Sequence, residues 1–270
     1  EHMDMSDFLE QLHRVREEGI PAIRLENETW RLTAIPEQNG TVMEMTYKPT
    51  GRNLAYDPVI GGMGKLFNER VFKENIVNGF DPNDPAEYQG KVEDSTLTLT
   101  RKQTDGSSLI RIIELKPDSP KTLFCRSVIT HRGEEPKMYR IMVQPSFSVG
   151  TFTRDYRILT GYCKNGEWIP LDEDWREGIN PRQDILSRSL QGGAIAFFNH
   201  ALRFGMMETY EADRFASVKF RWIGWIGPRP QLGLELMTQE VELKQGETFS
   251  YSYQLEYLDH PPNFQPVDSQ

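Results

Sequence analysis

The sequence predicts an all-β protein made of two stacked β-sheets, preceded by a single helix. Apolar and polar residues alternate along most of the chain, as they do in strands that have one buried face. Turns rich in Pro, Gly, Asn and Asp separate these stretches at short intervals. Convincing helical spacing of apolar residues occurs only near the start of the chain. Many short strands in succession are typical of a double antiparallel sheet.

The N-terminal segment is predicted to be a connector helix over residues 4–20. Its first three residues, 1–3, have the character of a cloning remnant and are excluded from the fold prediction. Gly19 can cap the end of the helix, and Pro21 prevents its continuation. The apolar stripe of this helix is formed by Met5, Phe8, Leu9, Leu12 and Val15. The helix either packs on the following sandwich or joins it to an upstream domain, and both alternatives stay open.

The segment after the helix is predicted to form a three-stranded meander. The runs 23–25, 30–34 and 42–47 alternate between apolar and polar residues. Residues 36–40 and 48–52 contain the Pro, Gly and Asn residues that favour turns. We therefore expect two reversals of chain direction within this segment.

Further strands are expected up to Tyr257. They are predicted over about 97–99, 109–115, 123–130, 138–143, 194–199, 202–209, 217–225, 232–237 and 249–257. Segments 75–89 and 171–190 are polar and rich in Pro, Gly and acidic residues, so we expect long loops there. Ligand sites often lie in such loops on a rigid sandwich. The predicted sandwich domain spans residues 21–258, and residues 259–270 form a tail.

Composition limits the kinds of partner. Forty acidic against 31 basic residues give a net charge of −9, which argues against nucleic acid as a partner. No apolar run approaches the roughly 20 residues that span a bilayer, so no membrane partner is expected. Cys125 and Cys163 are predicted to be two buried thiols, too few for a disulfide framework.

No motif for a nucleotide, a metal or a serine nucleophile is present, and we expect neither a cofactor nor a metal. The acidic residues Asp81, Asp84 and Glu87 raise the possibility of a calcium loop. Their spacing lacks the glycine and the regular alternation of an EF-hand loop. Acidic residues flanked by prolines indicate a capped turn instead.

The segment 23–54, IRLENETWRLTAIPEQNGTVMEMTYKPTGRNL, resembles the opening strands of the galactose mutarotase-like superfamily. A second similarity lies near the C-terminus, where Leu234-Glu235-Leu236 precedes the turn 243–247 and the terminal strand. The resemblance implies a β-supersandwich over almost all of residues 21–258. It also implies a ligand of the carbohydrate class.

In this superfamily a glutamate and a histidine carry out acid/base chemistry at the anomeric carbon. Glu235 matches the glutamate in order and spacing, and the resemblance implies that it is the general base. Because Glu235 alternates with two leucines, we expect it on the opposite sheet face from them. The alternative is an ordinary exposed glutamate on a solvent-facing strand.

The histidine of the superfamily corresponds to Gln144, which begins the stretch Gln144-Pro145-Ser146-Phe147. A glutamine can hydrogen-bond to a sugar hydroxyl, but it cannot act as a general acid near neutral pH. His200, between two predicted strands, is the histidine that we consider as a replacement.

Other residues are predicted to bind the substrate. Arg70 follows the glycine-rich segment 61–65, which is similar to a sugar-holding turn of the superfamily, although a loop that needs positive φ is the alternative. Asp81 and Trp175 lie in the two predicted loops and would reach the mouth of a site. Trp225, which follows a glycine at a strand end, can stack on a pyranose ring.

Two further tryptophans, Trp30 and Trp222, are assigned to the core. Arg140 precedes Gln144 on the same predicted strand. If the protein handles sugars, we expect Arg140, Gln144 and Glu235 to converge with Trp225 on one concave face.

Three functions stay open. The first is a carbohydrate-binding or accessory sandwich domain of a larger glycan-active protein, which the missing histidine and the connector helix favour. The second is a carbohydrate-active enzyme, similar to a sugar epimerase, that uses Glu235 as base together with an unidentified acid. The third is a purely structural domain that packs against a catalytic neighbour. The partners expected under the first two are a mono- or oligosaccharide and an upstream domain.

Overall fold

The computed structural model describes residues 21–37, 40–55, 74–78, 88–143, 145–149, 156–164, 167–174, 185–223 and 231–264. Within these ranges the chain consists mainly of strands, joined by turns and by short 3-10 segments at Ser187–Ser189, Gln191–Gly193 and Ala212–Arg214. None of the helices among the described residues has the length and apolar character needed to cross a membrane. The predicted helix over residues 4–20 lies outside the described residues.

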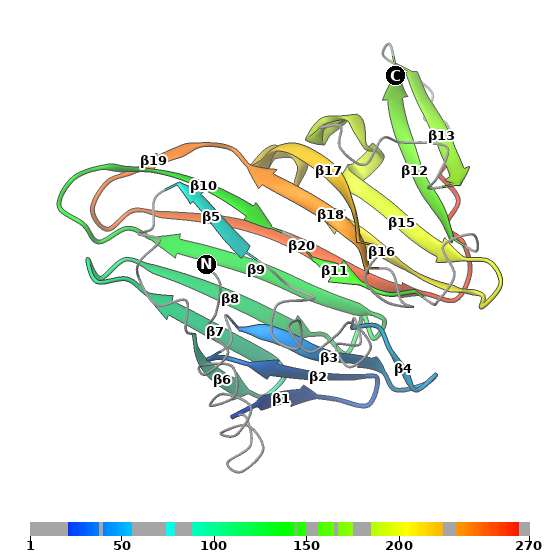
Figure 1. Ribbon diagram of the computed structural model, residues 1–270, viewed down its shortest axis with the longest axis horizontal. Helices are drawn as coiled ribbons and strands as arrows, with labels where there is room; N and C mark the ends of the chain where they lie inside the picture. The colour runs from blue at the N-terminus through cyan, green and yellow to red at the C-terminus, as the bar shows by residue number, and fades with distance from the viewer. Residues whose placement is uncertain are drawn as a thin grey trace, which may run out of the picture.

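The first described strands form a four-stranded antiparallel sheet in the order β1-β2-β3-β4 (Figure 1). Its strands are β1 (Ile23–Glu26), β2 (Trp30–Ile35), β3 (Thr41–Tyr47) and β4 (Arg52–Asn53). Alternation along β2 buries Trp30, Leu32 and Ala34. This arrangement confirms the meander and the core position of Trp30.

A seven-stranded sheet follows the path β14-β17-β18-β10-β19, with β11 paired to β18 and β5 paired to β10. Its strands are β5 (Glu74–Asn78), β10 (Lys137–Val143), β11 (Ser146–Phe147), β14 (Ile185–Leu186), β17 (Phe215–Ile223), β18 (Gln231–Thr238) and β19 (Val241–Leu243). Since β10 and β18 are far apart in the sequence, long-range pairing builds the middle of this sheet.

A nine-stranded sheet runs in the order β13-β12-β15-β16-β20-β9-β8-β7-β6. Its strands are β6 (Gln89–Glu93), β7 (Thr96–Lys102), β8 (Ser108–Leu115), β9 (Thr122–Thr130), β12 (Tyr156–Lys164), β13 (Glu167–Asp174), β15 (Ala194–Asn199), β16 (Phe204–Tyr210) and β20 (Thr248–Leu258). The last strand, β20, lies between β16 and β9 and so joins the two halves of the sheet.

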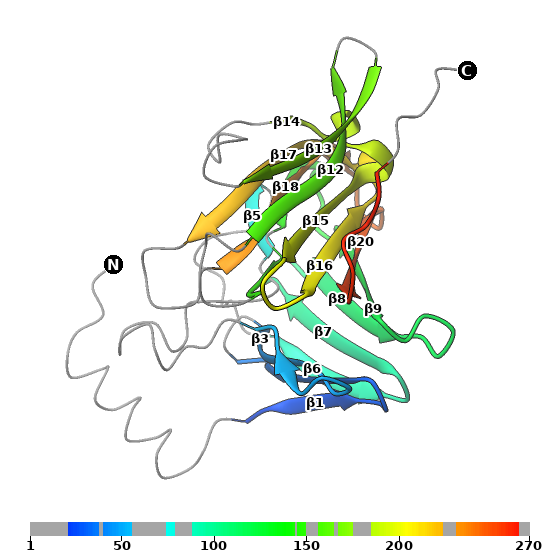
Figure 2. The ribbon, with the colours of Figure 1, turned by 90° about the vertical axis from the view of Figure 1, so that its right-hand side faces the viewer.

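The nine-stranded sheet packs against both other sheets. Figure 2 shows β17 and β18 alongside β15, β16 and β20, and β1 and β3 alongside β6 and β7. The ring of Phe215 in β17 meets that of Tyr251 in β20 edge-on, with centroids 5.7 Å apart. Buried apolar residues of all three sheets form one continuous core. The predicted all-β double-sheet class is therefore confirmed.

A buried arginine ties the four-stranded sheet to the nine-stranded one. Arg111 lies in β8 with 1% of its surface exposed, and its Nη1 donates a hydrogen bond of 2.9 Å to the Gly40 carbonyl oxygen. The guanidinium also lies 5.2 Å from the ring centroid of Tyr88. Because a guanidinium keeps its charge, this donor is costly to leave unpaired inside a core.

Three predictions of local structure were wrong in part. The expected loop 75–89 contains most of β5, and the expected loop 171–190 contains the end of β13 as well as β14. Strands of polar sequence form here because backbone hydrogen bonds to β10, β12 and β17 do not depend on side-chain polarity. Cys125 is a buried thiol as expected, but Cys163 is only half-buried.

Candidate functional site

The outer face of β18 carries Glu235. Along this strand Leu236 and Thr238 are fully buried, whereas Glu235 and Met237 are half-buried. Successive side chains of a strand point to opposite faces, so Glu235 and Met237 point away from the core. The face on which Glu235 lies is the one that the sequence predicted.

Lys219 is the cross-strand neighbour of Glu235. It lies directly opposite Glu235 in the pairing of β17 with β18, and its Nζ is 3.9 Å from Glu235 Oε1. The exposed fractions of the two side chains are 31% and 22%, so both remain reachable from solvent. The carboxylate accepts hydrogen bonds and the ammonium donates them, so together they can hold neighbouring hydroxyl groups.

Lys219 is a residue of this face that the sequence alone does not mark as part of a site. Its alternation with Val218 indicated the outer face, but not which residue of another strand it would meet. A tight hairpin turn fixes the register between the two strands that it joins, but a longer connection does not. The cross-strand partner of Lys219 therefore could not be predicted from the sequence.

Arg140 lies on the same outer face but at a distance. In β10 it is half-buried between Tyr139 and Ile141, which are fully buried. Met142, on the same face, pairs with Met237 of β18, and Val143 pairs with Leu236. Arg140 is therefore offset by four residues from the level of Glu235, or about 13 Å along the strands. Glu235 and Arg140 lie on the same sheet face, but they are too far apart to hydrogen-bond to the same ligand atom.

The remaining predicted site residues lie outside the described residues. They are Gln144, Trp225, Asp81, Arg70 and Trp175. In the described residues that flank Gln144 in the sequence, Val143 pairs with Leu236 and Ser146 pairs with Gly233. Two residues separate these pairs on each strand.

The histidines that the structure describes lie outside the described strands of the sheet that carries Glu235. His131 is buried; its Nδ1 is 2.8 Å from the Tyr139 hydroxyl and its Nε2 is 2.8 Å from the Glu135 carbonyl oxygen. His200 is exposed in the turn between β15 and β16, in the nine-stranded sheet. None of the described strands in the seven-stranded sheet contains a histidine. His200 is therefore not placed in the sheet that carries Glu235.

No group of three or more His, Cys, Asp or Glu side chains able to hold a metal ion occurs in the described part of the chain. The charged groups on this face of the seven-stranded sheet are the Glu235 carboxylate, the Lys219 ammonium and, farther along, the Arg140 guanidinium.

No protein-family model matches the chain, and no curated protein matches it. Solved structures do. A galactose mutarotase-like protein from Lactobacillus casei ATCC 334 is 12% identical with a TM-score of 0.62, over 88% of this chain and 100% of that one. The GalM/aldose epimerase homologue from C. elegans is 9% identical with a TM-score of 0.60, over 89% and 99% of the two chains.

A TPR-domain containing protein from Parabacteroides distasonis ATCC 8503 is also similar, at 15% identity and a TM-score of 0.60. The similarity covers 90% of this chain but only 48% of that one. At these identities the shared property is the fold. The chain has the galactose mutarotase-like β-sandwich fold, as the opening segment and the Glu235 segment predicted, in a strongly diverged sequence.

Proposed function

We propose that this chain is a carbohydrate-binding domain whose ligand lies on the outer face of the seven-stranded sheet, around Glu235. The observation that carries the proposal is the pair of Glu235 and Lys219, half-buried and 3.9 Å apart on that face. An acceptor beside a donor matches neighbouring sugar hydroxyls, each of which both donates and accepts. The fold supports this ligand class, since solved neighbours bear the names of sugar mutarotases and epimerases.

The proposal includes the substrate-binding residues predicted from the sequence. Gln144 is assigned a hydrogen bond to the same sugar as Glu235, which the equal two-residue spacing between the flanking strand pairs supports. Arg140 is assigned a second sugar unit, because its offset of about 13 Å exceeds one pyranose ring. Trp225, Asp81, Arg70 and Trp175 are assigned to the walls of the site. The ligand that fits this layout is an oligosaccharide.

Binding is favoured over turnover by the titratable groups of the site. Opening a pyranose ring requires one group that removes a proton and another that supplies one. Glu235 and Lys219 are cross-strand neighbours and would meet the same side of a sugar. The histidine that fills the acid role in the superfamily is replaced by Gln144. The second candidate is nevertheless an epimerase-like enzyme with Glu235 as base, because the fold is shared with an aldose epimerase homologue.

An accessory role within a larger glycan-active protein is part of the proposal. The similarity to the Parabacteroides protein covers about half of that chain, so this fold also occurs there as one part of a longer protein. The third function is that of a purely structural domain, which would bind no sugar. The titration described next distinguishes it from the other two functions.

Calorimetric titration with a panel of mono- and oligosaccharides tests the proposal, using wild type, Glu235→Gln and Lys219→Met. We expect each substitution to weaken binding by about 10- to 100-fold, the effect of a lost hydrogen bond to a charged group. Glu93→Gln, an exposed carboxylate paired with Lys91 in the edge strand β6, is the matched control and should bind as wild type does. Binding to no sugar in the panel would leave the structural domain as the function.

An NMR assay of anomer interconversion separates binding from catalysis. If the domain only binds, interconversion of a bound aldose proceeds at the uncatalysed rate. A rate increase that disappears in Glu235→Gln would establish the epimerase-like function instead.

A further inference from the structure

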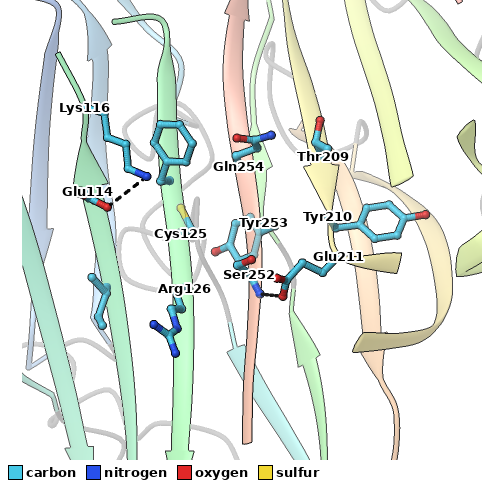
Figure 3. A pocket seen from close by; sticks show the side chains of 12 residues that line it. Glu114, Lys116, Cys125, Arg126, Thr209, Tyr210, Glu211, Ser252, Tyr253 and Gln254 are labelled. Atoms are coloured by element: carbon cyan, nitrogen blue, oxygen red, sulfur yellow. Dashed lines mark hydrogen bonds and ion pairs between the residues drawn. The ribbon is translucent and has the colours of Figure 1, made fainter. Parts of the chain in front are cut away.

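A hollow of about 500 Å³ lies on the outer face of the nine-stranded sheet, on a different sheet from Glu235. It extends over β8, β9, β20 and β16 (Figure 3). Its lining is built from two successive rows of side chains that cross these strands. Because the rows follow from the strand register, the backbone fixes the order of the lining residues.

The first row combines an aromatic ring with polar groups. Strand pairing places Glu114 beside Phe124, Phe124 beside Gln254, and Gln254 beside Thr209. All four side chains are half-buried and point away from the core. A carboxylate, a ring, an amide and a hydroxyl thus stand in line across four strands.

The second row is polar along most of its length. Arg126 lies opposite Ser252, and the Glu211 backbone N–H donates to the Ser252 carbonyl oxygen over 3.3 Å. The Ser252 N–H in turn donates to Glu211 Oε2 over 3.0 Å, which holds the carboxylate at the edge of the hollow. Figure 3 shows Glu211 and Ser252 between Thr209 on one side and Arg126 on the other.

Lys116 covers the aromatic ring of the first row. Its Nζ lies 4.0 Å from the Phe124 ring centroid and 3.7 Å from Glu114 Oε2. The Lys116 and Glu114 side chains are 39% and 47% exposed, so solvent weakens both contacts. The lysine can therefore turn aside and leave one face of the ring to a ligand.

The charges of the lining balance. Two carboxylates, Glu114 and Glu211, stand beside two cations, Lys116 and Arg126. A balanced lining selects neither polyanions nor polycations. An aromatic face with flanking donors and acceptors suits a ligand that has both C–H faces and hydroxyl groups, as a sugar ring does.

We propose that this hollow is a second carbohydrate site, which binds a neutral oligosaccharide across β8, β9, β20 and β16. Phe124 stacks on one ring, while Arg126, Gln254 and Ser252 hydrogen-bond to hydroxyls. The inference rests on the lining chemistry of this sheet and does not depend on the site at Glu235.

Titration with cellotetraose, xylotetraose, maltotetraose and mannotetraose tests the second site, followed by calorimetry and by amide NMR shifts. We expect at least one tetrasaccharide to bind and to shift the amides of Thr209, Ser252 and Gln254. Phe124→Ala and Arg126→Ala should each weaken that binding by about 10-fold or more. Val128→Ala, on the same face of β9 but outside the hollow, is the matched control and should leave binding unchanged.

Glu235→Gln distinguishes the two sites. Binding that is lost in Phe124→Ala and Arg126→Ala but kept in Glu235→Gln supports the second site. Binding that is lost in Glu235→Gln and kept in the other two variants overturns it and leaves the first site standing. Absence of binding to all four tetrasaccharides overturns the second site as well.

Discussion

The ring of Tyr257 in β20 stacks on the ring of Tyr47 in β3, with centroids 4.0 Å apart and planes inclined by 16°. Tyr257 also faces Phe204 of the neighbouring strand β16, with ring centroids 6.0 Å apart. The Arg52 guanidinium lies over the Phe204 ring at 4.2 Å. This aromatic stack joins the first sheet of the sequence to the last strand.

Removal of the stack should destabilise the fold. Replacing a buried aromatic ring by alanine costs about 3–5 kcal/mol, and we expect Tyr257→Ala to lose that much unfolding free energy. Tyr257→Phe keeps the ring and should cost far less. Urea unfolding measures both variants. Equal losses in the two would show that the hydroxyl, not the stacked ring, is what matters.

Two glycines with similar backbone angles should respond differently to alanine. Gly40 and Gly51 have φ values of +61° and +65°, so each pays the strain of a left-handed residue when it gains a Cβ. A Cβ on Gly51 meets no atom within 4 Å, whereas one on Gly40 would lie 3.1 Å from Leu99 and 3.2 Å from Arg111. Gly40→Ala should therefore cost about 1–3 kcal/mol more than Gly51→Ala in unfolding free energy. Equal costs would mean that Leu99 and Arg111 move away from the new Cβ without a loss of stability.

The buried contact of His131 with Tyr139 should be worth a measurable part of the stability. Since the Glu135 carbonyl oxygen can only accept, Nε2 of His131 carries the proton and Nδ1 accepts from the Tyr139 hydroxyl over 2.8 Å. Burial raises the pKa of Tyr139, so the hydroxyl stays a donor. Tyr139→Phe should lower the unfolding free energy by about 0.5–1.5 kcal/mol, because one buried hydrogen bond is lost while the Ser107 hydroxyl, 3.3 Å from Nδ1, remains as a second donor.

Tyr162→Phe, at a half-buried tyrosine of β12, is the matched control for this effect. Nitrogen-15 shifts of the His131 ring should identify Nε2 as the protonated nitrogen. A protonated Nδ1 in the neutral ring would contradict the assigned hydrogen bonds.

Acid titration should reveal the pair of Lys121 and Asp259. The Lys121 Nζ lies 2.6 Å from Asp259 Oδ2, and hydrogen bonds from Lys121 and then His260 lower the pKa of Asp259 to about 2. A lowered acid pKa contributes stability above its unfolded value of about 3.9, and this contribution is lost as the pH falls toward about 2. Both side chains are more than a third exposed, so the stability at stake is below about 1 kcal/mol.

Carboxyl carbon-13 NMR measures the Asp259 midpoint directly. Lys121→Met should move the midpoint upward from about 2 toward the ordinary aspartate range. Lys116→Met, which removes a lysine paired with Glu114, should leave it in place. An unchanged midpoint in Lys121→Met would assign the lowering to another group.

The pair of Glu235 and Lys219 should contribute little to stability. At 3.9 Å and with partly exposed side chains, its coupling energy in a double-mutant cycle should stay below about 1 kcal/mol. Thermal or urea unfolding of Glu235→Gln, Lys219→Met and the double variant gives this value. A larger coupling would show that the pair holds the sheet together, and binding defects in these variants would then report on folding.

Local patterns predicted the parts of the fold that depend on neighbours in the sequence. The alternation in β20 placed Tyr251, Tyr253 and Leu255 on the buried face, where they lie. The same rule placed Glu235 on the sheet face opposite to that of its neighbour Leu236. Such predictions succeed because the side-chain direction in a strand has a period of two and needs no knowledge of the partner.

What the sequence by itself determined is the all-β class, longer strands such as β2, β8, β9 and β20, and which face of these strands each side chain occupies. Only the tertiary structure decided that Lys219 meets Glu235, that Arg140 lies four residues away from their level, and that Tyr47 stacks on Tyr257. The physical reason is that pairing and register between distant strands depend on the packing of the whole core. A segment's own composition carries the period of a strand, but not the identity of the strand beside it.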